Sequence, residues 1–150
     1  MRELTLLLGT NLGDRQANLD EALERLDKAF GGRRLRASKV LETEAIGFSG
    51  PNFLNMTVVY SSRRSPESVL KLCKRIERAM GRKDAPEYAA DGCRIYHDRI
   101  IDIDILFYGD LRLSTPLLTI PHPQVESRPF VGILLEQTNS LADANRRCKC

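Results

Sequence analysis

The stretch 99–107, Arg-Ile-Ile-Asp-Ile-Asp-Ile-Leu-Phe, alternates apolar side chains with two aspartates. Because successive side chains of a β-strand point to opposite faces, this pattern predicts a strand with one apolar face and one face that carries both Asp102 and Asp104. The apolar face is expected to hold Ile101, Ile103, Ile105 and Phe107. The chain must therefore build a sheet that buries one face in a core and leaves two carboxylates, about 7 Å apart along the strand, on the other.

Two interpretations of this pair of carboxylates stand. Negative charges held this close repel each other and are costly to take out of water unless a cation neutralises them. In the first interpretation they bind a metal, with Mg²⁺ preferred because its ligands are carboxylate and water oxygens and its natural partners are phosphates. In the second, they lie in water on an amphipathic edge strand. The strand by itself does not decide between the two.

Length and composition narrow the class of protein. The 150 residues are 42% hydrophobic and 29% charged, which is typical of one soluble globular domain. A net charge of +3 suits an anionic small molecule and is too small to indicate nucleic-acid binding. The chain has no apolar run of membrane-spanning length and no signal-peptide pattern, and its four cysteines have neither zinc spacing nor the density of a disulfide scaffold. We expect a monomer in the reducing cytoplasm.

The first part of the chain predicts a strand, a helix and a second strand. Apolar residues 4–8 indicate a buried strand, and the turn at 9–14 leads into a helix that Asp14 caps and Gly31-Gly32 ends. The turn has neither the Gly-Lys-Ser/Thr ending nor the G-x-G-x-x-G spacing of phosphate loops, which favours a tight turn over a phosphate site. Imperfect alternation over 34–44 predicts the second strand.

A third strand is predicted over 53–62, where Asn55 shares a face with Phe53 and Thr57. A polar amide beside an aromatic ring can read the edge of a flat heterocycle, although an exposed strand face gives the same pattern. The strand alone leaves both interpretations open.

A second helix is predicted after Ser65, an N-cap that is followed by proline. Its apolar stripe contains Cys73, which indicates a core thiol, and ends at Gly81. Basic residues cover the rest of the helix and indicate a solvated face, with Arg82 as the exception. Residues 83–97 follow without periodicity, and an unstructured segment of this length predicts a binding loop or lid.

Two prolines enclose His122 in the extended segment 118–123, which favours binding or catalysis at the surface over a place in the core. A helix is expected from Pro129, and the tail after about residue 137 is expected to be frayed. The predicted order, β-α-β-β-α-β, is that of the ferredoxin-like arrangement. It implies an α+β fold with an antiparallel sheet, both helices on one face, and the other face left for the last helix and a ligand.

Five separated segments carry a specific combination of motifs: 7–13, 51–55, 76–82, the Arg-x-x-Asp-x-Asp-Ile-Leu run at 99–106, and Pro-His-Pro at 121–123 followed by Arg-Pro-Phe at 128–130. Together they resemble the 6-hydroxymethyl-7,8-dihydropterin pyrophosphokinase family of folate biosynthesis, from residue 7 to about residue 135. The resemblance implies a three-layer α/β/α form of the ferredoxin-like βαββαβ fold. It also implies that the pyrophosphoryl group of ATP is transferred to the hydroxymethyl group of the dihydropterin, with release of AMP.

The resemblance further implies roles for individual residues. Asp102 and Asp104 match the positions that hold two Mg²⁺ ions, which bridge the ATP phosphates. Catalytic positions beside them are matched by Arg82, Arg94 and Arg99. ATP-binding positions are matched by Glu77, Arg82, Ile105, Thr119, His122 and Arg128. Pterin-binding positions are matched by Gly9, Thr43, Ile46, Phe53, Asn55, Asp102 and Phe130, with the two phenylalanines on either side of the pterin ring.

The chain also departs from the family. It has no tryptophan in the segment 83–97, where Tyr96 stands as a substitute, and Pro123 follows the histidine in place of an aromatic residue.

Two other functions stay open. One is another Mg²⁺-dependent nucleotide enzyme with an Asp-x-Asp metal site, such as a nucleotidyl- or glycosyltransferase; nucleotidyl transfer would yield pyrophosphate where a pyrophosphokinase yields AMP. The other is a non-enzymatic ferredoxin-like module that binds RNA, but it predicts aromatic and basic side chains where this chain has two aspartates.

Overall fold

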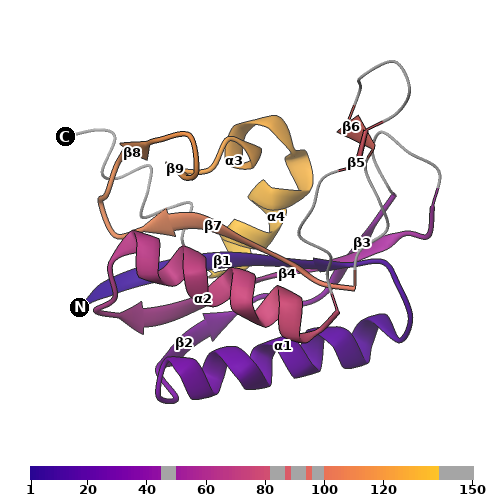
Figure 1. Ribbon diagram of the computed structural model, residues 1–150, viewed down its shortest axis with the longest axis horizontal. Helices are drawn as coiled ribbons and strands as arrows, with labels where there is room; N and C mark the ends of the chain where they lie inside the picture. Colours follow the sequence, from indigo (N-terminus) through magenta and orange to yellow (C-terminus); the bar gives the residue numbers. More distant parts are fainter. Residues whose placement is uncertain (45–49, 82–86, 89–93, 96–99, 139–150) are drawn as a thin grey trace.

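The structure, a computed structural model, describes residues 1–44, 50–81, 87–88, 94–95 and 100–138 (Figure 1). Its elements follow one another in this order: β1 (Arg2–Thr10), α1 (Arg15–Ala29), β2 (Arg34–Ala37), β3 (Leu41–Thr43), β4 (Phe53–Ser62), α2 (Pro66–Ala79), β5 (Glu87–Tyr88), β6 (Arg94–Ile95), β7 (Asp102–Tyr108), β8 (Leu113–Ser114), β9 (Thr119–Ile120), α3 (Gln124–Ser127) and α4 (Pro129–Thr138).

The main sheet has the strand order β2-β4-β1-β7, and β3 pairs with β4 as well. All of these neighbouring strands are antiparallel. Helices α1 and α2 pack on one face of the sheet and α4 packs on the other (Figure 1). The predicted α+β class with an antiparallel sheet is therefore confirmed.

The face of the sheet under α1 and α2 is an apolar core. Leu4, Leu6 and Leu8 of β1 have no exposed surface. They belong to one cluster with buried side chains of both helices, among them Leu19, Ala22, Leu26, Val69, Leu72, Cys73 and Ile76. Burial of each leucine stabilises the fold by about 1.5–3 kcal/mol relative to an exposed one. Cys73 is the core thiol that its helical position predicts.

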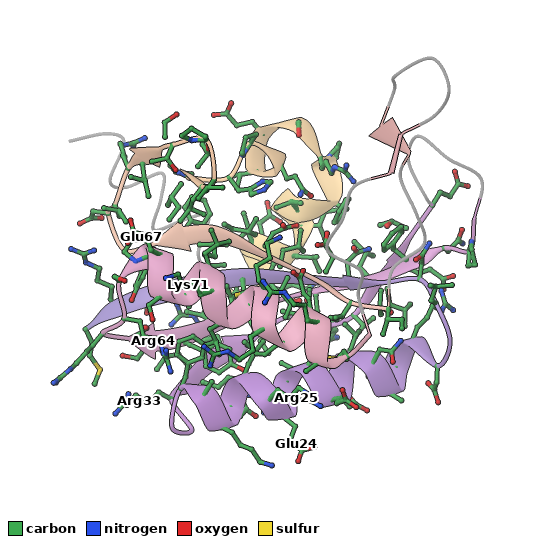
Figure 2. The ribbon with its side chains drawn as sticks, in the orientation of Figure 1. Glu24, Arg25, Arg33, Arg64, Glu67 and Lys71 are labelled. Atoms are coloured by element: carbon green, nitrogen blue, oxygen red, sulfur yellow. The ribbon has the colours of Figure 1, made fainter. Side chains whose placement is uncertain are left out.

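Both long helices begin at their predicted caps. The side chain of Asp14 accepts a hydrogen bond from the first turn of α1 at 3.1 Å, and the side chain of Ser65 does the same for α2 at 3.1 Å. The outer sides of the helices are charged and exposed, as Figure 2 shows for Glu24, Arg25 and Lys71. This agrees with a solvated basic face on α2.

Helix α4 covers part of the opposite face of the sheet. Leu7 of β1 packs there in a second cluster with Leu106, Phe107, Val131, Leu134 and Leu135. Thr57 of β4 donates a hydrogen bond from Oγ1 to the carbonyl oxygen of Leu134 at 3.2 Å. Successive leucines of β1 thus serve two different cores, one on each side of the sheet.

A β-bulge at Leu106 corrects one expectation. Strict alternation predicts Phe107 on the same face as the isoleucines, but the register pairs Leu6 with Ile105 and Thr5 with Phe107, so Leu106 has no register partner on β1. The extra residue resets the alternation, so both Leu106 and Phe107 face α4. Ile101, Ile103 and Ile105 face α1 and α2 as predicted.

Residues 34–44 form two short strands where the alternation predicts one. Ser38 lies between β2 and β3, and its Oγ accepts a hydrogen bond from Thr57 N at 2.9 Å. A side-chain acceptor thus takes the place of a backbone carbonyl at this point of the ladder, which interrupts the strand. The sequence also predicts no helix at α3, which precedes the expected helix at Pro129.

The tail predicted to be frayed lies outside the described residues beyond Thr138, and most of the predicted binding loop 83–97 does too. In the described part of the chain, no helix is long and apolar enough to cross a membrane.

Candidate active site

A row of register partners crosses the face of the sheet that α4 covers in part. Leu41, Asn55, Gly9 and Asp102 are paired in turn, across β3, β4, β1 and β7. Strands lie about 4.8 Å apart, so Asn55 and Asp102 project from the same face roughly 10 Å apart, with only a glycine between them. Asp104 projects from this face two residues further along β7. The sheet therefore brings an amide and two carboxylates, distant in sequence, to one surface.

Strand β3 holds Asn55 in place. Asn55 is only 5% exposed, and its Nδ2 donates to Thr43 Oγ1 at 2.8 Å and to Leu41 O at 3.3 Å. Its Oδ1 faces Gly9, where a Cβ would lie 3.2 Å from that oxygen and 3.7 Å from the ring of Phe53. Gly9 thus keeps space open beside an amide oxygen, which is an acceptor for an N–H of a ligand.

Asp104 is linked to the segment that follows β9. Gln124 Nε2 donates to Asp104 Oδ2 at 3.1 Å, and His122 Nε2 lies 4.0 Å from Asp104 Oδ1. His122 Nδ1 accepts a hydrogen bond from the backbone N–H of Gln124 at 3.1 Å, so the proton of the neutral ring is on Nε2, toward the aspartate. The backbone N–H of His122 donates to Leu106 O at 3.0 Å and ties the segment to β7.

Burial and neighbouring charges shift the pKa values of Asp104 and His122. Burial raises the pKa of Asp104 well above its ordinary value, and the negative charges of Asp102 and Glu77 raise it further. Burial lowers the pKa of His122; Asp102 offsets part of this, and the positive charge of Arg128 adds to it. The site therefore combines a crowded pair of carboxylates, which a cation would stabilise in their charged forms, with a neutral imidazole whose proton is on Nε2.

The segment of α3 and α4 contributes further predicted residues. Arg128 lies between the two helices, near enough to His122 to affect its pKa. Phe130 packs against the cluster that contains Leu7 and so lies on the site's side of the sheet. The structure thus gathers on this side most of the predicted residues that it describes: Gly9, Thr43, Phe53, Asn55, Asp102, Asp104, His122, Arg128 and Phe130. Thr119 is half-buried in β9.

Glu77 and Ile105 belong to the helix-covered side of β7. Glu77, on α2, is 1% exposed, and its Oε2 accepts a hydrogen bond from Ile103 N at 2.9 Å. It satisfies a backbone N–H on the edge of β7 that faces away from β1. Ile105 is 3% exposed in the core. The structure gives both a supporting place, and their contact with ATP stays a prediction.

Gln124 is a site residue that sequence reasoning misses. Its only signal is its place two residues after His122, at the start of a helix too short to be recognised from periodicity. Arg82, Arg99 and Ile46 lie outside the described residues, as does the side chain of Arg94 in β6. Their predicted roles are not tested by the geometry.

Comparison with known proteins gives a consistent result. Residues 5–140 match the model of the family 7,8-dihydro-6-hydroxymethylpterin-pyrophosphokinase. The chain is 42% identical over 132 residues to a 2-amino-4-hydroxy-6-hydroxymethyldihydropteridine pyrophosphokinase of Porphyromonas gingivalis, which covers 87% of this chain and 86% of the relative. It is 35% identical over 131 residues to the protein of the same description in Aquifex aeolicus, covering 87% and 76% respectively. A mitochondrial folate synthesis bifunctional protein of Pisum sativum is 40% identical over 130 residues, 86% of this chain but 24% of that longer protein.

Proposed function

Since the chain belongs to the 7,8-dihydro-6-hydroxymethylpterin-pyrophosphokinase family, we propose that the face carrying Asn55, Gly9, Asp102 and Asp104 is its reaction centre. The chain is a pyrophosphokinase of folate biosynthesis: it transfers the pyrophosphoryl group of ATP to the hydroxymethyl group of 6-hydroxymethyl-7,8-dihydropterin and releases AMP. The observation that carries the proposed site is the register itself, which sets an acceptor for a heterocycle and two carboxylates on one face.

The acidic pair is the proposed Mg²⁺ site. Asp102 and Asp104 offer the oxygen ligands that Mg²⁺ prefers, and a bound cation would favour the charged form of Asp104, whose pKa is raised by burial and by repulsion from Asp102 and Glu77. Within the described ranges no three His, Cys, Asp or Glu side chains form a metal-binding group, so water and phosphate oxygens would complete the coordination. Two bound ions would neutralise the phosphates and orient them for transfer.

His122, Gln124 and Arg128 are proposed to form the phosphate side of the site. Neutral His122 presents an Nε2–H donor, and Arg128 adds positive charge beside it. Transfer of this kind passes through a loose transition state, where alignment and charge neutralisation matter more than a strong base. Further ATP contacts are proposed for Glu77, Ile105 and Thr119 and for the arginines Arg82, Arg94 and Arg99.

The bond changes define what this site must hold in line. The hydroxymethyl oxygen forms a bond to the β-phosphorus of ATP, and the bond from that phosphorus to the α,β-bridging oxygen breaks. The bridging oxygen leaves with AMP, and the proton of the hydroxyl group is released.

The pterin is proposed to lie over Gly9. Asn55 Oδ1 would accept a hydrogen bond from the pterin edge, because Thr43 and Leu41 already orient the amide through Nδ2. Phe53 and Phe130, which come from β4 and α4 on the same side of the sheet, are proposed to stack on the two faces of the ring. Ile46 is proposed to contribute to the same pocket.

We further propose that the fold is the ferredoxin-like βαββαβ arrangement in three α/β/α layers. The support is the strand order β2-β4-β1-β7, with α1 and α2 on one face and α4 on the other. On composition, the chain is proposed to act as a single-domain monomer in the cytoplasm.

The proposed function is tested by incubating the chain with ATP, MgCl₂ and 6-hydroxymethyl-7,8-dihydropterin and separating the nucleotides by chromatography. We expect AMP and a pyrophosphorylated pterin, no turnover with EDTA, and a loss of about 10³-fold or more when Asp102→Ala and Asp104→Ala are combined. Asp20→Ala, an exposed acid on α1, is the control and should keep full activity. Release of inorganic pyrophosphate in place of AMP would indicate a nucleotidyl transferase, and full turnover in the double variant would refute the metal site.

A further inference from the structure

The turn between β1 and α1 carries polar side chains that the proposed chemistry does not use. We propose that Arg15, together with Asn11, Glu42 and Asn52, positions the Phe53 end of β4 and thereby sets the affinity of the enzyme for the pterin. We refer to these four residues as the Arg15 clamp. The inference rests on the proposed pterin site and names positioning residues that touch no substrate.

Arg15 joins β3 to Asn52, the residue directly before β4. Its Nη1 donates to the backbone carbonyl of Asn52 at 2.9 Å and to Glu42 Oε2 at 3.3 Å. Asn52 Nδ2 donates to the same Glu42 oxygen at 3.2 Å, which closes a ring of three contacts. Because donor or acceptor is charged in each of them, these are among the stronger hydrogen bonds available at a surface.

Asn11 holds the neighbouring residue. It is 1% exposed, and its Nδ2 donates to Pro51 O at 3.1 Å. Asn18 fixes the turn from which Asn11 projects, by donating to Leu12 O at 2.7 Å. Two consecutive carbonyls, those of residues 51 and 52, are therefore held by one side chain of the turn after β1 and one at the start of α1.

The position of Arg15 in its helix supports a dedicated role. It is the first residue of α1, directly after the N-cap Asp14, and the first turn of α1 contains no acidic residue. A positive charge at a helix N-terminus opposes the helix dipole and is unfavourable. The contacts of Arg15 with β3 and with residue 52 compensate for this position.

The clamp acts at the end of β4 that carries Phe53. The register of β1 with β4 ends at the pair Thr10–Leu54, and the preceding residue of β4, Phe53, pairs with Thr43 of β3. Glu42 precedes Thr43 and points to the opposite face of β3, so the clamp lies behind the pterin face. Thr43 in turn accepts the hydrogen bond that orients Asn55. Loss of the clamp would therefore loosen both Phe53 and the acceptor for the pterin.

The test compares Arg15→Ala with wild type in steady-state kinetics. We expect the KM for the pterin to rise roughly three- to tenfold, as loss of a partly exposed ion pair and a charge-assisted hydrogen bond implies, with kcat and the KM for ATP within about twofold. Arg15→Lys should fall between the two, because the ammonium keeps the positive charge but lacks the fixed, planar donor geometry of the guanidinium. Arg25→Ala is the matched control: Arg25 is an exposed arginine of the same helix and pairs with Glu21 at 3.2 Å (Figure 2).

Direct binding of 6-hydroxymethylpterin, followed by fluorescence, separates the clamp from the proposed function. A wild-type chain that makes AMP while Arg15→Ala keeps the same pterin KM and loses only thermal stability overturns the clamp alone. An equal rise in the KM for ATP also overturns it. A wild-type chain that makes no AMP but binds the pterin more tightly than Arg15→Ala overturns the function and leaves the clamp. Absence of both turnover and binding in wild type overturns both.

Discussion

On β7, Ile103 and Asp104 are neighbours in sequence and lie on opposite faces of the sheet. Ile103 is 4% exposed and belongs to the core under α1 and α2. The side chain of Asp104 is 24% exposed and contacts Gln124 across the other face. The same division runs through β1, where Leu6 and Leu8 are fully buried on the helix side and Gly9 follows on the site side.

The difference shows how one sheet serves two purposes. The helix-covered face gains stability from apolar burial, which is insensitive to the direction of any single contact. The other face collects groups that lower the stability of the fold when no ligand is bound: two neighbouring carboxylates, a glycine in a strand, and a buried amide. Because strand side chains alternate, both sets of residues are held by the same backbone without competing for space. Stability and chemistry should therefore be separable by substitution, face by face.

The largest effect on stability is expected on the helix-covered face. Leu6→Ala should lower the free energy of unfolding by about 2–5 kcal/mol, because Leu6 has no exposed surface and its truncation leaves a cavity in the core. Activity per folded molecule should be unchanged, as Leu6 faces away from the site. Urea unfolding and kinetics at low temperature measure the two quantities. Leu117→Ala, at an 84% exposed position, should change neither. A lower kcat in folded Leu6→Ala would break the separation of the faces.

A smaller effect is expected at the site face, and on binding instead of stability. In Gly9→Ala the new methyl group would lie 3.2 Å from Asn55 Oδ1, in the space proposed for the pterin. We expect the KM for the pterin to rise about tenfold, since overpacking of this kind costs roughly 1–3 kcal/mol. Gly132→Ala on α4 is the matched control, because a Cβ added at Gly132 would meet nothing within 4 Å, and it should keep the wild-type KM. An unaltered pterin KM in Gly9→Ala would place the ring elsewhere.

The smallest expected effect on stability is an increase. The pKa of Asp104 is raised in the folded chain, so the folded state binds its proton more tightly than the unfolded state does. Without metal, this group therefore makes wild type lose stability as the pH rises from its unfolded pKa near 4 through the higher folded pKa. Asp104→Asn removes this loss and should be more stable than wild type by about 1–2 kcal/mol at high pH, with little difference at pH 4.

Urea unfolding at both pH values with EDTA present measures this difference, and Asp20→Asn on the exposed side of α1 serves as control. The same Asp104→Asn variant should be inactive with Mg²⁺. If its stability relative to wild type does not depend on pH, Asp104 is not a destabilised carboxylate, and the contrast between the two faces is weaker than the structure implies.

Local patterns predict much of this fold because they depend on near neighbours in the chain. The period-2 alternation of 53–62 places Asn55 with Phe53 and Thr57, and the caps Asp14 and Ser65 mark both long helices. The face shared by Asp102 and Asp104 follows from the same rule, so the acidic centre of the site is predictable from sequence.

The features that sequence reasoning misses depend on contacts between distant segments. The bulge at Leu106 is visible only in the register with β1, and the break at Ser38 depends on a bond to Thr57. Gln124 reaches Asp104 because the backbone of His122 is anchored to β7, which no local pattern of residues 118–124 reveals. The clamp contacts of Arg15 are of the same kind: one end is local to a helix start, and the other is 37 residues away.

The bulge at Leu106 also makes the number of residues in β7 critical. Asp104 precedes the bulge by two residues, and the carbonyl of Leu106 receives the backbone N–H of His122. Adding or deleting one residue between them would turn either the aspartate or the anchor of the histidine to the wrong side of the sheet, because each step along a strand reverses its direction. Neighbouring side chains can repack around a substitution, but no repacking of side chains restores the register of the strand. Between residues 102 and 106 the fold should thus tolerate a change of residue type more readily than the insertion or deletion of one residue.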